Sequence, residues 1–298
     1  MSSYLETTVE TPPPPLGVSA KLVRLAIIGL VLAGFAGTFA YLGGWFSPKE
    51  LTPARLTDAF EQADGLHPGF RRNHARGVCV SGSFESNGKG VRLSKAAVFE
   101  AGRVPVIGRF SVGGGDPDRT DRPDEVRGLG LQFSTSNGEV WRTSMIHLPV
   151  FLVRTPESFH EFVIAGAPDP ATGKPNPAKL KEFFGRHPES VAALEIIKSQ
   201  PPSSGFADTT FHGLHAFRFT NAAGVSVPVR WILTPEQPFE AAGPAPEDKK
   251  YLFNDLIAQI HRQPLHWRLI LLVGQPGDPT NDATLPWPAE RPAVRRRP

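Results

Sequence analysis

The chain has 298 residues, of which 40% are hydrophobic, so it is long enough for one large domain or two small ones. A net charge of +3 gives no electrostatic reason to expect a nucleic-acid partner. A single cysteine excludes an intramolecular disulfide and any metal site built from several cysteines. The 31 prolines and 29 glycines favour a loop-rich β or α+β domain over a helical bundle.

An uncharged apolar segment, residues 25–46, lies near the N-terminus and is long enough to cross a bilayer as a helix. Lys21 and Arg24 precede it, and aromatic residues mark its far end. This pattern predicts a single-pass membrane anchor over 21–47, with the N-terminus in the cytoplasm and the following domain periplasmic or extracellular. A cleaved signal peptide is the alternative, but the apolar run is longer than is usual for one. Residues 1–20 are expected to form a disordered tail.

The rest of the chain carries helix and strand patterns in a clear order. In chain order they are a helix over 52–63, strands over 75–84, 91–100, 104–112 and 128–134, helices over 156–166 and 177–198, a strand hairpin over 215–233, a helix over 247–262 and a strand over 266–273. Strands, then helices, then more strands predict an α+β fold, an antiparallel β-barrel with inserted helices, over residues 48–288. Residues 289–298 are expected to be an irregular basic tail.

A histidine between arginines, in the stretch RRNHARG at residues 71–77, leads directly into the first predicted strand. Taken alone, His74 is most simply a surface residue in a solvated basic turn. The chain has no GxGxxG, Walker A or GxSxG motif, so nucleotide binding and esterase chemistry have no support.

Four segments, RRNHARG among them, resemble motifs of the heme catalase family in the family's own order. They are RRNHARG (71–77), VPVIGRFSVGGGDPDRTDRPDEVRGLGLQF (104–133), GEVWRTSMIHLPVFLVRTPESF (138–159) and GLHAFRFTNAAGVSVPVRW (213–231). The likeness covers roughly residues 52–288 and is strongest to the short catalase-related peroxidases, here in a membrane-anchored form. Because the four motifs are collinear, their joint signal is much stronger than that of any one of them.

The resemblance implies a heme b cofactor, a peroxide substrate and an unidentified small organic reductant. His74 would be the catalytic acid and base, since a neutral imidazole can accept and return a proton near neutral pH, and Ser111 would orient it. Arg71 and Arg109 would bind the heme propionates, because guanidinium groups match carboxylates in geometry and charge. Phe159 would lie near the face of the heme.

The sequence departs from the family at two points. Ile146 stands where the family has an asparagine that donates a hydrogen bond to peroxide, which predicts weak catalase activity at most. The family's axial tyrosine belongs to a motif beyond the segment that resembles Trp287 and Pro288, so no metal ligand is assigned here. Tyr4, Tyr41 and Tyr251 are at the wrong places in the order.

Two functions remain open on these grounds. The expected function is that of a heme-dependent peroxidase that reduces hydrogen peroxide or organic peroxides with an organic donor. The alternative is a degenerate catalase-like barrel that no longer binds heme and acts as a non-enzymatic binding module. A truncation, a frameshift or a loss of function would each produce the missing tyrosine motif, and the sequence does not indicate an oligomeric state.

The remaining candidate residues are interpreted as structural. Cys79 lies inside a predicted strand and is expected to be a small buried apolar residue. His147, His212 and His215 lack the spacing of a metal-binding cluster, so they are interpreted as structural histidines.

Overall fold

The computed structural model describes residues 17–45, 50–288, 290, 291, 293 and 294. The chain separates into two compact units, residues 1–53 and residues 54–298. The disordered tail expected over residues 1–20 lies, as far as residue 16, outside the described residues. Most of the basic tail expected over residues 289–298 also lies outside them.

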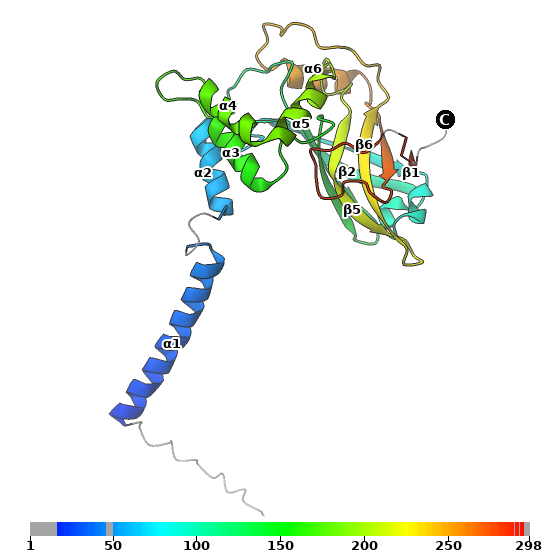
Figure 1. Cartoon of the computed structure of the whole chain (residues 1–298). Coiled ribbons are helices and arrows are strands. Elements are labelled where there is room, and N and C mark those ends of the chain that lie inside the picture. The colour runs from blue at the N-terminus through cyan, green and yellow to red at the C-terminus, as the bar shows by residue number, and fades with distance from the viewer. Residues whose placement is uncertain (1–16, 46–49, 289, 292, 295–298) are drawn as a thin grey trace, which may run out of the picture. The chain divides into compact units, whose positions relative to one another are not determined.

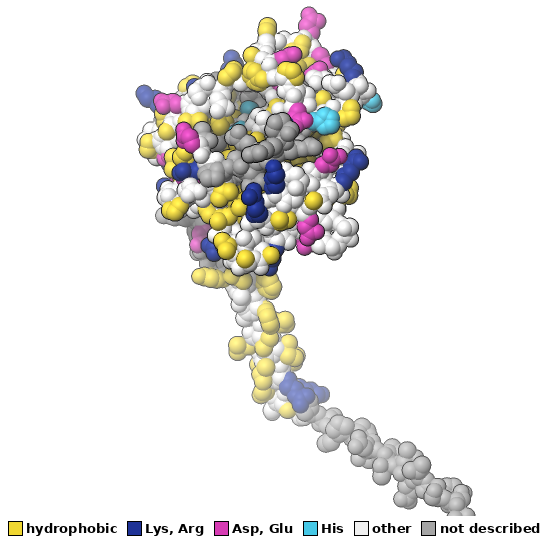
Figure 2. All heavy atoms as spheres, turned by 90° about the vertical axis from the view of Figure 1, so that its right-hand side faces the viewer, with side chains coloured by type: hydrophobic (Ala, Val, Ile, Leu, Met, Phe, Trp, Pro, Cys, Tyr) yellow, Lys and Arg dark blue, Asp and Glu magenta, His cyan; other side chains and the backbone are white. Residues whose placement is uncertain are grey.

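The first unit contains one long helix, α1, which spans Val18–Leu42 (Figure 1). None of its side chains is buried, and Figure 2 shows hydrophobic side chains along the visible length of the helix. Among the described residues it is the one helix that is long and apolar enough to cross a membrane. The length and apolar composition of α1 therefore agree with the membrane-spanning helix that the sequence of residues 25–46 suggested.

The second unit is built on an antiparallel sheet whose strands follow one another in chain order. The strands are β1 (Gly77–Ser86), β2 (Gly102–Val112), β3 (Arg127–Ser134), β4 (Val140–Ile146), β5 (Phe211–Thr220), β6 (Ser226–Pro235), β7 (Trp267–Val273) and β8 (Ala293–Val294). Every neighbouring pair is antiparallel, and the sheet curls around its own core (Figure 1). This arrangement agrees with the predicted antiparallel fold.

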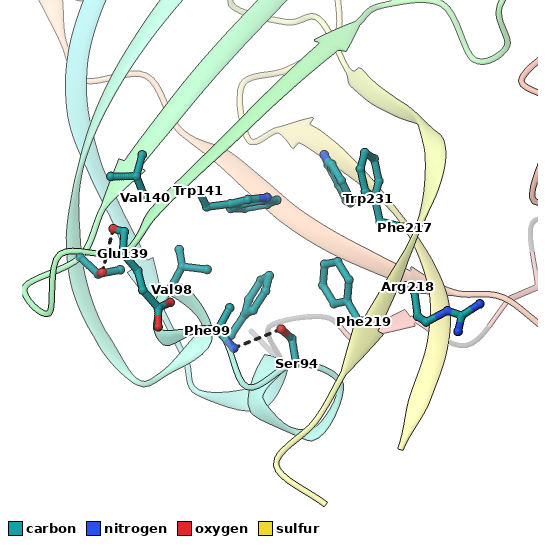
Figure 3. A pocket seen from close by; sticks show the side chains of 12 residues that line it. Ser94, Val98, Phe99, Glu139, Val140, Trp141, Phe217, Arg218, Phe219 and Trp231 are labelled. Carbon is teal, nitrogen blue, oxygen red and sulfur yellow. Dashed lines mark hydrogen bonds between the residues drawn. The ribbon is translucent and has the colours of Figure 1, made fainter. Parts of the chain in front are cut away.

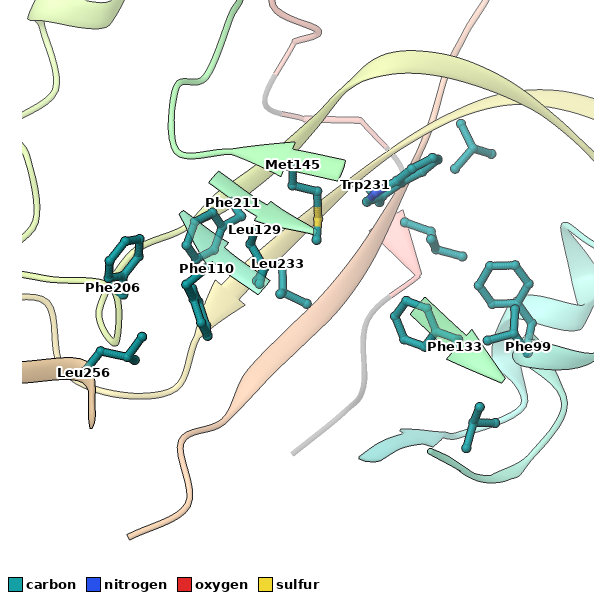
Figure 4. Close-up of a cluster of buried hydrophobic side chains, with 14 of the residues drawn as sticks. Phe99, Phe110, Leu129, Phe133, Met145, Phe206, Phe211, Trp231, Leu233 and Leu256 are labelled. Carbon is teal, nitrogen blue, oxygen red and sulfur yellow. The ribbon is translucent and has the colours of Figure 1, made fainter. Parts of the chain in front are cut away.

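Alternation along the strands separates the inner face of the sheet from its outer face. On β2, Phe110 is buried against the core, whereas Ile107 on the opposite face is 61% exposed. Figure 4 shows aromatic and aliphatic side chains from several strands filling the inner side, among them Phe133 and Trp231. The outer face is thus the one that remains for other elements or ligands to cover. Cys79 belongs to this outer face and is exposed, so the prediction that it is buried was wrong.

Helices accompany the sheet and form a group of their own beside it (Figure 1). They are α2 (Pro53–Asp64), α3 (Pro156–Gly166), α4 (Pro177–Arg186), α5 (Pro188–Lys198) and α6 (Tyr251–Arg262). Helix α3 begins with a capping box in which Thr155 and Ser158 each bond the other's backbone amide. The insertion between β4 and β5 contains α3, α4 and α5. Strands β4 and β5 are paired at one position only, Ile146 with His212.

Three local predictions differ from the structure. Residues 91–100 form two 3-10 turns, η1 (Lys89–Arg92) and η2 (Ala97–Phe99), because the consecutive residues Val98 and Phe99 are both buried and a strand would point them to opposite faces. The single helix expected over 177–198 is two helices, since Pro188 ends the hydrogen bonding of the first and starts the second. Strand β4 was not predicted.

A buried arginine ties the loop before β5 to the sheet. The Arg127 guanidinium is fully buried and donates to Ser203 Oγ at 2.7 Å, to the Gly205 carbonyl at 3.1 Å and to Thr209 Oγ1 at 3.2 Å. Such charge-assisted bonds are costly to break in a buried setting, because each freed group would be left without a partner. Arg127 therefore fixes the position of the chain that leads into β5.

Candidate functional site

His74 is held in an unusual backbone conformation at the start of β1. Its φ of 53° lies in the left-handed region, where it is the one non-glycine residue among the described residues. The Asn73 side chain stabilises this conformation, since its Oδ1 accepts from the amides of His74 and Gly114, both at 2.8 Å. The Ala75 amide donates to the Gly114 carbonyl at 3.0 Å. Strained backbone of this kind is concentrated at functional sites, because the surrounding contacts must hold it in place.

The imidazole of His74 is oriented by the sheet. Its Nδ1 lies 3.1 Å from Ser111 Oγ on β2. Gly128 on β3 pairs with Ser111, and a Cβ at that glycine would stand 3.1 Å from His74 Cε1 and 3.2 Å from Ser111 Oγ. The glycine therefore leaves room for the ring to lie against β3. Because Nδ1 is hydrogen-bonded to the serine, Nε2 is the ring nitrogen that can exchange a proton with a substrate.

Two arginines flank His74 and give its surroundings a positive charge. Arg109 Nη2 donates to the carbonyl of His74 at 3.1 Å and to that of Ala75 at 3.3 Å, and the absence of a side chain at Gly77 makes room for the guanidinium. Arg71 is exposed. Burial, followed by the charges of Arg109 and Arg71, lowers the pKa of His74 and keeps the imidazole neutral near pH 7.

The two guanidinium groups repel each other without a carboxylate between them. Burial and the charge of Arg71 lower the pKa of Arg109. Among the described residues, neither arginine forms an ion pair with an Asp or Glu side chain. An anion bound beside these two arginines would relieve the repulsion between them.

Phe159 belongs to an aromatic cluster that reaches the His74 segment only indirectly. Its ring lies 5.5 Å from Phe151 and 5.9 Å from Phe60 of α2, measured between centroids. The same helix contacts the His74 segment, since Glu61 pairs with Arg72, and Asp64 Oδ2 accepts from the Gly115 amide at 2.7 Å. The structure thus brings His74, Ser111, Arg71 and Arg109 together directly and connects Phe159 to them through α2.

Sequence reasoning missed Asn73, Gly128, Phe151 and Phe60. The first three lie inside the motifs that were recognised, so their position in RRNHARG, RGLG and PVF was the available signal. Phe60 had no signal beyond its place on the apolar face of a helix, because its partner Phe159 is far away in the sequence.

Ile146 lies on the same outer face as Ser111. The register pairs Gly77 with Ser111, Ser111 with Gly128, Gly128 with Ile146, and Ile146 with His212. Residues directly opposite each other in antiparallel strands point to the same face. Ile146 therefore stands one strand away from Gly128 and offers a hydrocarbon surface, without a hydrogen-bond donor, to this part of the site.

The tyrosines that the structure describes lie elsewhere. Tyr251 is at the start of α6 and packs against the core, where burial raises its pKa. Tyr41 belongs to α1 in the other unit. The described residues contain no cluster of three or more His, Cys, Asp or Glu that could hold a metal ion.

The curled antiparallel sheet thus brings a histidine, a serine and two arginines together at one end. A family model described as Catalase matches residues 53–283. A catalase-related peroxidase of Synechococcus elongatus is 35% identical over 274 residues, which are 91% of this chain and 78% of the relative. One of Mycolicibacterium paratuberculosis is 31% identical over 242 residues, which are 80% of this chain and 76% of the relative.

Solved structures agree on the fold. Catalase A from Saccharomyces cerevisiae superposes with a TM-score of 0.67 at 17% identity, over 99% of this chain and 57% of that one. A bacterial catalase gives a TM-score of 0.68 at 21% identity, over 84% of this chain and 52% of that one. The chain thus spans about half the length of the solved catalases that it matches.

The chain therefore belongs to the catalase family, a family of oxidoreductases that act on peroxide and generally bind heme. Within the family its curated relatives include the catalase-related peroxidases, as the four motifs predicted.

The described residues fit one face of a heme. The two unpaired guanidinium groups of Arg71 and Arg109 suit two propionates, and the neutral imidazole of His74 suits the peroxide side of the group. Tyr251, the tyrosine that the structure describes in this unit, packs against the core.

Two partly buried histidines beside the site make the stability of the protein depend on pH. Burial, above all, lowers the pKa of both His147 and His212 from 6.5 to about 4. The unfolded chain therefore binds protons first as the pH falls, so the stability is complete above about pH 6.5 and is lost toward pH 4. The difference between 6.5 and about 4 corresponds to about 3 kcal/mol for each histidine as an upper bound. Urea unfolding of the full chain in detergent at pH 4 to 7 measures this loss.

The variant His212→Gln should lose about half of this pH dependence, because one of the two groups no longer titrates. His215→Gln is the matched control, since His215 is an exposed histidine on the same strand and should leave the profile unchanged. An unchanged profile in His212→Gln would contradict the assignment.

Proposed function

We propose that the protein is a membrane-anchored, heme-dependent peroxidase that reduces hydrogen peroxide or organic peroxides with an organic electron donor. The observation that carries the proposal is the pairing of His74 with Ser111 beside two arginines that have no carboxylate partner. Bound heme b would supply the oxidation and reduction chemistry that no side chain in the described site offers.

The residues of the chain have separate tasks in this proposal. Arg71 and Arg109 would hold the propionates by charge and by hydrogen bonding. His74 takes a proton from one peroxide oxygen at Nε2 and returns it to the other, which requires the neutral ring that its lowered pKa maintains. Ser111 holds the ring in place through Nδ1. Phe159 and its neighbour Phe151 provide apolar surface next to this region.

The first test is heme binding and turnover in the full chain, purified in detergent after growth with added heme. His74→Gln should keep the heme content and lower peroxidase turnover about 100-fold to 10,000-fold, because general acid and base catalysis of this kind contributes that much. Ser111→Ala should lower turnover less, since the ring would be less well oriented but still present. A heme-free wild-type chain would favour the alternative, a barrel that has become a non-enzymatic binding module.

A second test concerns Ile146. The variant Ile146→Asn places an amide donor one strand away from Gly128, where the resemblance implies that the family has its asparagine. We expect the ratio of hydrogen peroxide disproportionation to donor oxidation to rise, because the amide can donate to the bound peroxide and isoleucine cannot. Oxygen evolution and donor oxidation are measured on the same preparation. Ile146→Val is the apolar control, and an equal ratio in the two variants would oppose this role.

The proposal places the catalase-like domain on the periplasmic or extracellular side of the membrane. The basic residues Lys21 and Arg24 before the apolar run support a cytoplasmic N-terminus. Cys79 is the single cysteine of the chain and is exposed, so it reports the side on which the domain lies. A membrane-impermeant maleimide should label Cys79 in intact cells, and Cys79→Ser is the background control. Labelling only after lysis would reverse the topology.

A further inference from the structure

A second hollow lies at the other end of the sheet from His74. It has a volume of about 350 Å³ and is lined where β4 begins and where β5 ends, with Trp141 and Phe219 among its walls. Ile146 is the last residue of β4, so the site around His74 and this cavity are at opposite ends of the same strand. None of the residues assigned to the peroxide site lines the cavity.

The walls of the cavity are mainly aromatic. Centroid distances are 5.3 Å from Phe99 to Phe219, 5.5 Å from Phe99 to Trp141, 5.4 Å from Trp141 to Trp231 and 5.1 Å from Phe217 to Trp231. Figure 3 shows these five rings arranged around a common space. Phe217 is 52% exposed, although it sits in this ring cluster. Phe217 therefore offers part of its ring to a molecule that enters the cavity.

Two polar side chains that line the cavity, Glu139 and Ser94, already accept hydrogen bonds from the backbone. Glu139 Oε2 accepts from the Ala97 amide at 2.9 Å, and Ser94 Oγ accepts from the Ala96 amide at 3.2 Å. The Arg218 side chain points away from the rings (Figure 3). Because the Glu139 carboxylate stands at the rim and the Arg218 guanidinium is directed away from the rings, the walls themselves offer only aromatic surface, on which a neutral ring could stack while its hydroxyl bonds the rim oxygens. The volume is within the range of small-molecule sites.

One wall of the cavity connects it to the strand beside the peroxide site. The Trp231 indole lies over Gly213, where a Cβ would be 2.6 Å from Nε1, and that nitrogen donates to Thr143 Oγ1 at 3.0 Å. His212 precedes Gly213 and belongs to the outer-face row that contains Ile146. One sheet thickness therefore separates an indole of the cavity wall from the face that carries the distal residues. Indole is more easily oxidised than a phenyl ring, so Trp231 suits a path for electrons.

We propose that this cavity binds the electron donor and that the donor is a small neutral aromatic alcohol of the phenol class. The assignment rests on the proposed peroxidase function. One peroxide takes up two electrons and two protons, its O–O bond breaks, and it yields water together with a second water or an alcohol. Two phenol molecules each lose one electron and one proton in the same cycle and become phenoxyl radicals, so atoms and electrons balance.

Binding is tested first, by calorimetric titration of the full chain in detergent with 4-methoxyphenol. Phe217→Ala should weaken binding and raise the Kd about twofold to tenfold, which is the effect of losing one aromatic pair. Phe239→Ala is the matched control, because Phe239 is a similarly exposed phenylalanine outside the cavity. Val140→Trp adds a large side chain at the rim and should abolish binding. No saturable binding to the wild type, or equal Kd values in all four proteins, would overturn the proposal.

The role as a donor site is tested next, in the heme-loaded chain. Phe217→Ala should raise the KM for 4-methoxyphenol by the same factor as the Kd and leave the KM for peroxide unchanged. An unchanged donor KM would overturn the assignment of the donor to this cavity. A heme-loaded chain without turnover would refute the peroxidase function and the donor role together, while the Kd values would still decide whether the cavity is an aromatic binding site.

Discussion

The register of the antiparallel sheet is the constraint on which the site depends. It sets Gly77, Ser111, Gly128 and Ile146 in one row across four strands, so that a hydroxyl stands between two glycines. The space above those glycines accepts the Arg109 guanidinium and the His74 ring. A slip of one residue would turn Ser111 toward the core and replace it on the outer face by Phe110 or Val112. The buried alternation of β2 prevents that slip, because the apolar side chains would then face outward.

The positive charge beside His74 has two effects, one on the imidazole and one on anions. Arg71 and Arg109 oppose protonation of the imidazole, and the same two charges make the region attractive to a dianion. A carboxylate from the protein would satisfy the arginines, but it would also raise the pKa of His74 and occupy the anion site. The strained backbone at His74 and its support from Asn73 show that the surrounding structure holds this group in place at an energetic cost.

Local pattern predicted most of the strands and helices, and collinear motifs predicted the family, but contacts between distant segments were not predictable. Helix 156–166 was predicted with the bounds that it has, because proline, capping residues and an apolar face all agree there. The segment 91–100 was mistaken for a strand because its hydrophobic residues allowed that reading, while the burial of both Val98 and Phe99 is a tertiary effect. The contact of Phe60 with Phe159 and the ring of aromatic residues around the cavity join segments far apart in sequence, so no single stretch reveals them.

The two ends of the sheet carry different chemistry. Around His74 the chain offers an acid–base group, two cations and the hydrocarbon of Ile146, which together suit proton transfer to a peroxide held near an anionic cofactor. Around Trp141 and Trp231 it offers π surface, which suits the neutral aromatic donor that we propose. A donor at the far end would not compete with peroxide for the distal space, and the wall between the two includes an oxidisable indole over Gly213. Because electrons can cross a sheet that molecules cannot, one fold could keep oxidant and reductant apart while joining their reactions.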